Sequence, residues 1–151
     1  MEDRIPRAAP LSLSQMKTLE HGAGDAVTKD GAPRRISIVD DDASIREALK
    51  SLMRAVRFNV DTFASAEEFL ASGRLNDTAC LILDVTLPGM SGFELQDQLN
   101  SKRPGIPIVF ITAHADEPSR QRALKGGAID FLSKPVRREP LFKAIQAAIG
   151  S

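Results

Sequence analysis

The sequence predicts an α/β fold, a doubly wound five-stranded parallel sheet with helices on both faces. From residue 35 onward, short apolar runs alternate strictly with segments of helical character, five times over. Most of these runs have no polar side, which indicates strands buried on both faces and is typical of parallel sheets. Right-handed crossovers then place helices on both faces of the sheet. The expected strands are 36–39, 58–63, 79–85, 106–112 and 128–132.

A helix signal follows each expected strand. Between residues 45 and 56, apolar side chains spaced four, three and four apart form the stripe of an amphipathic helix, and Asp42 is a candidate N-cap for it. A helix start at 116–118 is followed by a glycine stop at 126–127, and the last helix is expected near residue 140. Two further helices are expected to open at S-x-x-E capping boxes, Ser65 with Glu68 and Ser91 with Glu94.

Composition excludes several classes of protein. The chain has 151 residues, 42% of them hydrophobic and 26% charged, which fits one globular domain with a core of ordinary size. The formal net charge is +0, so no basic field would hold nucleic acid, and direct binding of nucleic acid by this chain is not expected. No apolar run reaches the length of a membrane span, and the N-terminus lacks a signal-peptide core. We therefore expect a cytoplasmic protein without membrane contact.

The chain divides into two parts of different composition. Residues 1–34 mix Pro, Gly, Ser and charges of both signs with few apolar anchors, and we expect a disordered N-terminal extension there. Residues 35–151 form the expected folded domain. Its single cysteine, Cys80, has no partner for an internal disulfide and lies in an apolar run. A buried, unreactive thiol is therefore expected.

Acidic side chains follow two of the expected strands. Asp40, Asp41 and Asp42 come directly after the first strand, and Asp84 ends the most apolar strand. The carboxyl ends of parallel strands share one edge of the sheet, which is where ligands of such folds bind. Neighbouring carboxylates repel one another unless a cation offsets them, and oxygen ligands favour a hard cation such as Mg²⁺. The sequence therefore predicts a magnesium site at this edge.

Two further side chains are expected at the same edge. Thr112 ends the fourth strand, and Lys134 follows the fifth. A metal ion, an ammonium group and a hydroxyl around one carboxylate suit a phosphoryl group, whose oxygens carry spread negative charge. An aspartate can itself be the nucleophile and form an aspartyl-phosphate. Asp84 is the best candidate, because it stands alone after a buried strand and before a turn.

Four segments, "IVDDD", "LILDVTLPGMSGFEL", "VFITAHAD" and "GGAIDFLSKPV", carry a resemblance to a known family. From about residue 34 to 149, the chain resembles the receiver domain of response regulators, the phosphoacceptor module of bacterial two-component signalling. The resemblance implies the flavodoxin-like (βα)5 receiver fold. The amino-acid sequences of the last two segments are most similar to those of receivers that precede helix-turn-helix output domains.

The resemblance implies a role for each acidic residue. Asp84 would be the phosphorylated aspartate, and Lys134 would contact the phosphoryl group through a side chain aimed by a cis peptide bond before Pro135. Mg²⁺ would be bound directly by Asp41, largely through water by Asp40, and by Asp84 and the backbone carbonyl of Thr86. Self-phosphorylation from a donor and autodephosphorylation would be the only reactions, so the protein is not expected to be an enzyme.

The resemblance also implies a phosphorylation-dependent switch. A sensor histidine kinase or a phosphotransfer protein would supply the phosphoryl group. The Thr112 hydroxyl would move toward it, and Phe131 would rotate inward. The residues at Thr86 and His114 would tune the lifetime of the phosphorylated state. The surface over 117–149 would then bind a second copy of the domain, an output protein, or an output domain absent from this chain.

Two departures and two alternatives accompany this interpretation. A minimal receiver has no counterpart of residues 1–34, and no output domain precedes Ser151, so the chain is either a stand-alone receiver or a piece of a longer regulator. A Mg²⁺-dependent phosphatase of haloacid-dehalogenase type also uses an aspartyl nucleophile, but it needs a second Asp where this chain has Thr86. A pseudo-receiver that binds partners without phosphoryl chemistry is the other alternative, although none of the reactive positions is missing.

Overall fold

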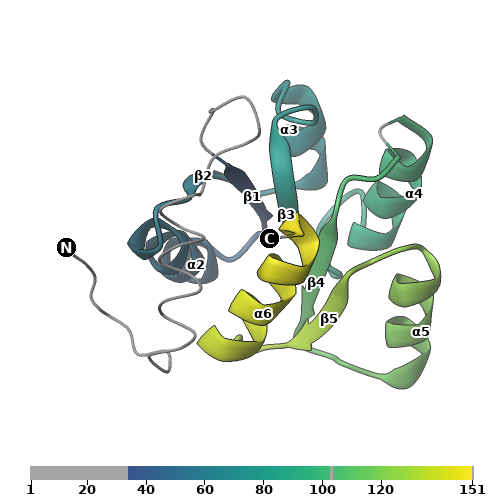
Figure 1. Cartoon of the computed structure of the whole chain (residues 1–151). Helices are drawn as coiled ribbons and strands as arrows, with labels where there is room; N and C mark the ends of the chain where they lie inside the picture. The colour runs from purple at the N-terminus through teal and green to yellow at the C-terminus, as the bar shows by residue number, and fades with distance from the viewer. Residues whose placement is uncertain (1–33, 103, 151) are drawn as a thin grey trace.

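A computed structural model describes residues 34–102 and 104–150 of the chain. The extension expected at 1–34 lies outside the described residues, apart from Arg34. Strands and helices alternate as the sequence predicts, and Figure 1 shows their arrangement. Their bounds are β1 (Arg35–Val39), α2 (Ala43–Ala55), β2 (Asn59–Phe63), α3 (Ala66–Ala71), β3 (Thr78–Asp84), α4 (Gly92–Lys102), β4 (Ile108–Thr112), α5 (Glu117–Lys125), β5 (Asp130–Ser133) and α6 (Arg138–Ile149).

The five described strands form one sheet in the order β2-β1-β3-β4-β5, and every neighbouring pair is parallel. The chain first runs from β1 outward to β2 and then crosses back over β1 to β3. The strand order therefore reverses between β1 and β3, which are direct neighbours. In open α/β sheets this reversal opens a crevice at the carboxyl ends of the two strands, where ligands bind.

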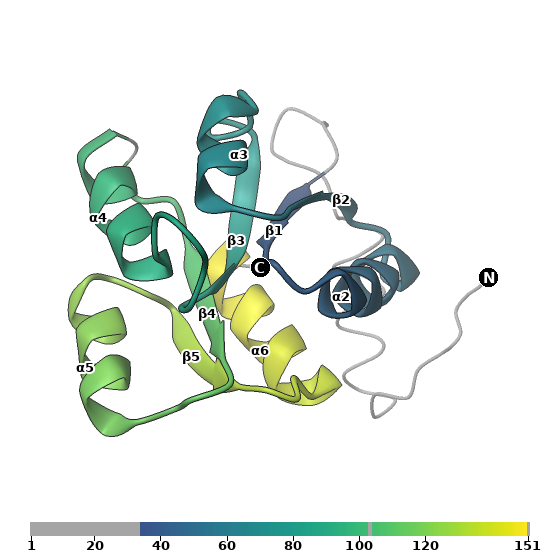
Figure 2. The same ribbon diagram turned by 180° about the vertical axis from the view of Figure 1, so that it is seen from behind.

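Helices cover both faces of the sheet, and each face has its own hydrophobic core. On one face, Leu49 and Met53 of α2 pack with Leu141 and Ile145 of α6 against alternate residues of the central strands. On the other face, the core includes side chains of α3, α4 and α5. Figures 1 and 2 show the sheet between these two layers, with α4 and α5 side by side in both views. The predicted doubly wound fold is confirmed.

The predicted helix caps form as hydrogen bonds. Asp42 caps α2, because its side chain accepts from the backbone N–H groups of Ser44 and Ile45. Ser91 and Glu94 form a complete capping box at α4, with bonds of 3.1 and 2.8 Å. The box at α3 differs in one bond, since Glu68 accepts from the N–H of residue 64 rather than from that of Ser65. Side-chain caps therefore fix where these helices begin.

Three strands begin later than the sequence indicates, the second by a single residue, at Asn59 rather than at residue 58. The fourth begins at Ile108 rather than at residue 106, because Pro107 has no N–H to donate to a ladder. The fifth begins at Asp130 rather than at residue 128, because the N–H of Ala128 closes the end of α5 by donating to Ala123. Gly127, in the connection between α5 and β5, has a φ of +97°, in the left-handed region that glycine adopts most readily.

Candidate functional site

The predicted site residues meet at the carboxyl edge of the sheet. Asp40 directly follows β1, Asp84 ends β3, and Thr112 ends β4. Lys134 follows β5, and its backbone N–H donates to the Thr112 carbonyl at 2.8 Å. Because β1 and β3 are neighbours at the reversal of strand order, Asp40 and Asp84 lie beside each other. The fold thus brings together side chains that lie far apart in the sequence.

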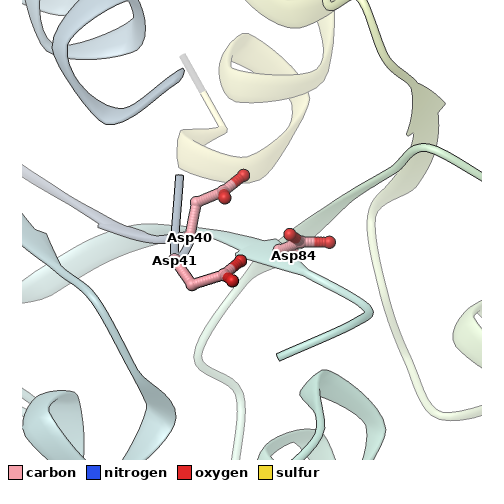
Figure 3. A group of neighbouring side chains, drawn as sticks. All are labelled: Asp40, Asp41 and Asp84. Carbon is pink, nitrogen blue, oxygen red and sulfur yellow. The ribbon is translucent and has the colours of Figure 1, made fainter. Parts of the chain in front are cut away.

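Three carboxylates form a cluster at the reversal point. Asp40, Asp41 and Asp84 each offer an oxygen within 4.8 Å of the others. Figure 3 shows Asp40 and Asp41 leaving the end of β1 with their carboxylates extended toward the side where Asp84 lies. Asp40 and Asp84 are buried, whereas Asp41 is exposed. Asp42, the fourth acid considered, turns away to cap α2.

Lys134 places an ammonium group between the two buried acids. Its Nζ lies 2.8 Å from Asp40 Oδ2 and 3.0 Å from Asp84 Oδ2. Burial disfavours the ammonium, but the two carboxylates outweigh that effect and raise the pKa of Lys134. Lys134 is therefore charged where it faces the acids. The expected cis peptide bond between Lys134 and Pro135 is also present.

Asp84 has the environment of a reactive group. Burial raises its pKa above the ordinary value of 3.8, and the nearby negative charge of Asp40 adds to that effect. The Lys134 contact and a 3.1 Å hydrogen bond from the Thr86 N–H to Asp84 Oδ1 work in the opposite direction. A carboxylate in such a site is costly to ionise in the metal-free protein. A bound cation would lower that cost.

The donor set fits a hard divalent cation. Asp40 Oδ2 is buried and has an ion-pair contact to Lys134, but within the described part of the chain it has no hydrogen-bond donor with suitable geometry. A buried carboxylate oxygen with unused acceptor capacity, beside the oxygens of Asp41 and Asp84, matches the all-oxygen coordination of Mg²⁺. The predicted acidic cluster is therefore present where the metal was expected.

The other predicted residues lie around this centre. Thr112 is buried, and its Oγ1 accepts a 3.1 Å hydrogen bond from the backbone N–H of His114. Thr86 and His114 are exposed, in the loops that follow their strands. Phe131 is only 8% exposed, and its ring centroid lies 6.4 Å from that of Phe110. Phe131 is thus already largely inside the core that faces α4 and α5.

Three residues near the site were not singled out from the sequence. Arg46 of α2 donates from Nη1 to the Asp40 carbonyl at 2.7 Å. Glu67 of α3 accepts a 2.9 Å bond from the Met90 N–H in the loop after Asp84. Gly92 has no room for a side chain, because a Cβ there would fall on the Asp84 carbonyl. The last glycine of "PGMSG" is Gly92 itself, so the sequence did carry a signal for this close contact. The contacts of Arg46 and Glu67 depend on how their helices pack.

Comparisons with known proteins agree with this geometry. A model of the response regulator receiver domain matches residues 36–146, and the chain belongs to this family. Nodulation protein W of Bradyrhizobium diazoefficiens is 49% identical over 113 residues, which are 75% of this chain and 50% of that protein. The response regulator protein TodT of Pseudomonas putida is 46% identical over 114 residues, 76% of this chain and 50% of TodT.

A solved structure is also similar. The response regulator StyR has a TM-score of 0.71 with 49% sequence identity, over 77% of this chain and 59% of StyR. The chain spans about half the length of the curated relatives it matches. Family membership and fold favour a phosphorylation-dependent signalling switch over the phosphatase alternative. Among the described residues, no helix is long and apolar enough to cross a membrane.

Proposed function

We propose that Asp84 accepts a phosphoryl group from a sensor histidine kinase or a phosphotransfer protein. One Asp84 carboxylate oxygen attacks phosphorus, the bond from phosphorus to the donor's imidazole nitrogen breaks, and the nitrogen keeps the electron pair. The observation that carries the proposal is the buried pair of Asp84 and Asp40 with Lys134 2.8 to 3.0 Å from both. This arrangement supplies a nucleophile and a fixed positive charge in one place.

The surrounding residues would support transfer in distinct ways. Mg²⁺, held by Asp40, Asp41, Asp84 and the Thr86 backbone carbonyl, would neutralise charge on the phosphoryl oxygens. Lys134 would contact one of those oxygens, since its ammonium already lies against Asp84. These steps need no substrate beyond the phosphodonor. The protein then acts as a signalling switch, in the cytoplasm where its kinase presents the phosphohistidine, rather than as an enzyme with turnover of its own.

Incubation with Mg²⁺ and acetyl phosphate, followed by intact-mass measurement, tests the proposal. Wild type should gain the mass of one phosphoryl group, and Asp84→Asn should gain none. Asp41→Ala should also lose the increment, because it removes a metal ligand. Asp42→Ala is the matched control, because it removes a neighbouring carboxylate that caps α2 and should cost only about 1 kcal/mol of stability. An increment that persists at full yield in Asp84→Asn would overturn the assignment.

The lifetime of the phosphorylated state would depend on two exposed side chains. Thr86 and His114 each lie two residues beyond a site residue, on loops at the same edge of the sheet. We expect them to flank the path of the water that hydrolyses the acyl phosphate. A Thr86/His114 double alanine variant should therefore change the rate of phosphate loss more than the rate of phosphate gain. Equal loss rates in the variant and wild type would contradict this role.

The signal would leave through the surface formed by residues 117–149. The phosphoryl group carries about −1.5 to −2 charge and three acceptor oxygens, in place of the single charge of the Asp84 carboxylate. The Thr112 hydroxyl, which now accepts from the His114 N–H, would turn toward them, and Phe131 would adjust behind it. The surface would then bind a second copy, an output protein, or an output domain that is not among residues 1–151.

Beryllofluoride offers a test of this output surface, because BeF₃⁻ on Asp84 stands in for the phosphoryl group. Loading with BeF₃⁻ and Mg²⁺ should shift amide resonances across 117–149 and not merely around the acids. Light scattering on the same sample reports whether the partner is a second copy. Amide shifts confined to the strand ends, with unchanged mass, would mean that this surface is not the output. Loading Asp84→Asn is the control, and it should produce no shifts.

A further inference from the structure

Arg46 occupies a place on α2 where the helix dipole, taken alone, disfavours a cation. Asp42 is the N-cap, so Arg46 lies within about one turn of the positive end of the helix dipole. The side chain does not extend into solvent: it is half-buried and reaches back to the carbonyl oxygen of Asp40, 2.7 Å from Nη1. A residue that goes against a local preference in this way often serves a site.

The carbonyl that Arg46 contacts belongs to the peptide joining Asp40 to Asp41. Two other contacts already hold the Asp40 side chain: the Asp42 N–H at 2.9 Å from Oδ1, and Lys134 Nζ at 2.8 Å from Oδ2. The Asp41 carboxylate is exposed, so its direction depends on the backbone that carries it. Rotation of this peptide would swing Asp41 away from Asp84. The Arg46 bond opposes that rotation.

We propose that Arg46 is a positioning residue for the metal site: its guanidinium fixes the Asp40–Asp41 peptide and so keeps the Asp41 carboxylate within coordinating distance of Asp84. This inference rests on the proposed Mg²⁺-dependent function. It goes beyond that function by assigning a structural determinant of metal affinity to α2. Arg46 itself offers no oxygen and is not a ligand.

A competing account makes the opposite prediction. If Arg46 only added positive charge near the acids, it would repel Mg²⁺, and removing it would tighten metal binding. If Arg46 positions Asp41, its removal weakens binding although a repelling charge has gone. The sign of the change in affinity therefore separates the two accounts. Loss of fold alone would lower stability but leave the Mg²⁺ affinity of the remaining folded protein unchanged.

Calorimetric titration of the full chain with Mg²⁺ provides the test. Arg46→Met keeps the apolar stem but removes the donors, and we expect its dissociation constant for Mg²⁺ to rise about three- to tenfold, because only part of the free energy of one charge-assisted hydrogen bond is passed on to the metal site. Arg46→Lys restores a donor and should recover most of the affinity. Arg54→Ala, which removes an exposed arginine from the same helix, is the matched control and should stay within about twofold of wild type.

Amide spectra of the metal-free proteins give a second readout. Arg46→Met should shift the amide resonances of Asp41 and Asp42, while Arg54→Ala should leave them in place. Equal or tighter Mg²⁺ binding by Arg46→Met would overturn the proposal while leaving the proposed function intact. If wild type itself bound no Mg²⁺ and accepted no phosphoryl group, the positioning role of Arg46 and the proposed function would both be wrong. Weaker binding in Arg46→Met with recovery in Arg46→Lys would support the positioning role.

Discussion

Replacing Asp84 by Asn should stabilise the metal-free protein, although it removes a native ion pair. The Asp84 carboxylate lies within 4.8 Å of oxygens of both Asp40 and Asp41. At an effective dielectric constant of about 20, each repulsion is roughly 3.5 kcal/mol or more. The attraction to Lys134 at 3.0 Å is about 5.5 kcal/mol on the same scale. Two repulsions exceed this one attraction by about 1.5 kcal/mol, and the cost of burying the charge has the same sign.

The side-chain amide introduced by Asp84→Asn would have a smaller opposing effect. Its NH₂ group must face either the Lys134 ammonium or the Thr86 N–H, so one hydrogen bond is lost at a cost of about 1 kcal/mol. Relief of the burial cost offsets that loss. We therefore expect the free energy of unfolding of Asp84→Asn to exceed that of wild type by about 1 to 2 kcal/mol in EDTA at low salt. With saturating Mg²⁺ the order should reverse, because the ion stabilises the wild-type fold by binding.

The stability that Asp84→Asn gains over wild type should depend on pH with a definite sign. The pKa of Asp84 is raised in the folded state, chiefly by burial, so the folded protein holds this proton more tightly than the unfolded chain. The free energy of unfolding of wild type therefore falls as pH rises from 3.8, the ordinary pKa of the group, through the raised pKa of Asp84 in the folded state. Above that folded-state pKa it stays lower. The advantage of Asp84→Asn should be present above the folded-state pKa and should shrink as pH falls through it.

Urea unfolding followed by far-ultraviolet circular dichroism measures this effect, since the chain has no Trp or Tyr to report by fluorescence. Asp97→Asn is the matched control. Its carboxylate is 70% exposed and 3.9 Å from Arg122, so the substitution should change stability by less than about 0.5 kcal/mol. If Asp84→Asn were less stable than wild type in EDTA, the repulsion between the acids would be smaller than this reasoning requires.

Three further expectations concern residues around the site and in the core. Gly92→Ala should lower the free energy of unfolding by about 1–3 kcal/mol in urea titrations and displace the backbone at Asp84, because its Cβ would fall on the Asp84 carbonyl; unchanged stability would contradict that packing. Gln96→Ala should cost about 1–3 kcal/mol in the same assay, since the buried Gln96 amide donates to the Ala123 carbonyl at 3.0 Å; a neutral effect would show that water replaces the bond. The Cys80 thiol, whose pKa burial raises to about 12, should react with a disulfide reagent only when the protein unfolds; rapid labelling without urea would mean that this strand opens.

The order of the elements was predictable because each apolar run and each cap is a local signal. The buried strand 79–85, for example, needs no knowledge of its neighbours to be recognised, and the structure places it at Thr78–Asp84 in the middle of the sheet. Strand starts were less predictable. Residue 128 is apolar like the strand that follows it, but its N–H belongs to the closure of α5, which depends on the conformation of the preceding glycine pair.

The site was predictable to the extent that it is built from strand ends. Asp40 and Asp84 converge because they end neighbouring parallel strands, and Lys134, which follows β5 beyond β4, reaches them from the same edge with its long side chain. The contacts that the helices contribute could not be found in this way. Whether Arg46 reaches the Asp40 carbonyl depends on the rotation of α2 about its axis, and whether Glu67 reaches the Met90 N–H depends on where α3 packs. Spacing in the sequence sets neither quantity.

The burial of Phe131 limits where the energy for switching can come from. A fully buried aromatic side chain removes about 150–250 Å² from water, and Phe131 is already buried except for 8%. Further inward rotation would therefore bury only about 12–20 Å², worth roughly 0.3–0.5 kcal/mol. Such a gain cannot by itself bias a two-state surface strongly, because a tenfold shift in population needs about 1.4 kcal/mol. In the proposed switch, the larger contribution would come from the phosphoryl group's own contacts with Lys134 and Thr112, and Phe131 would follow the space that Thr112 leaves.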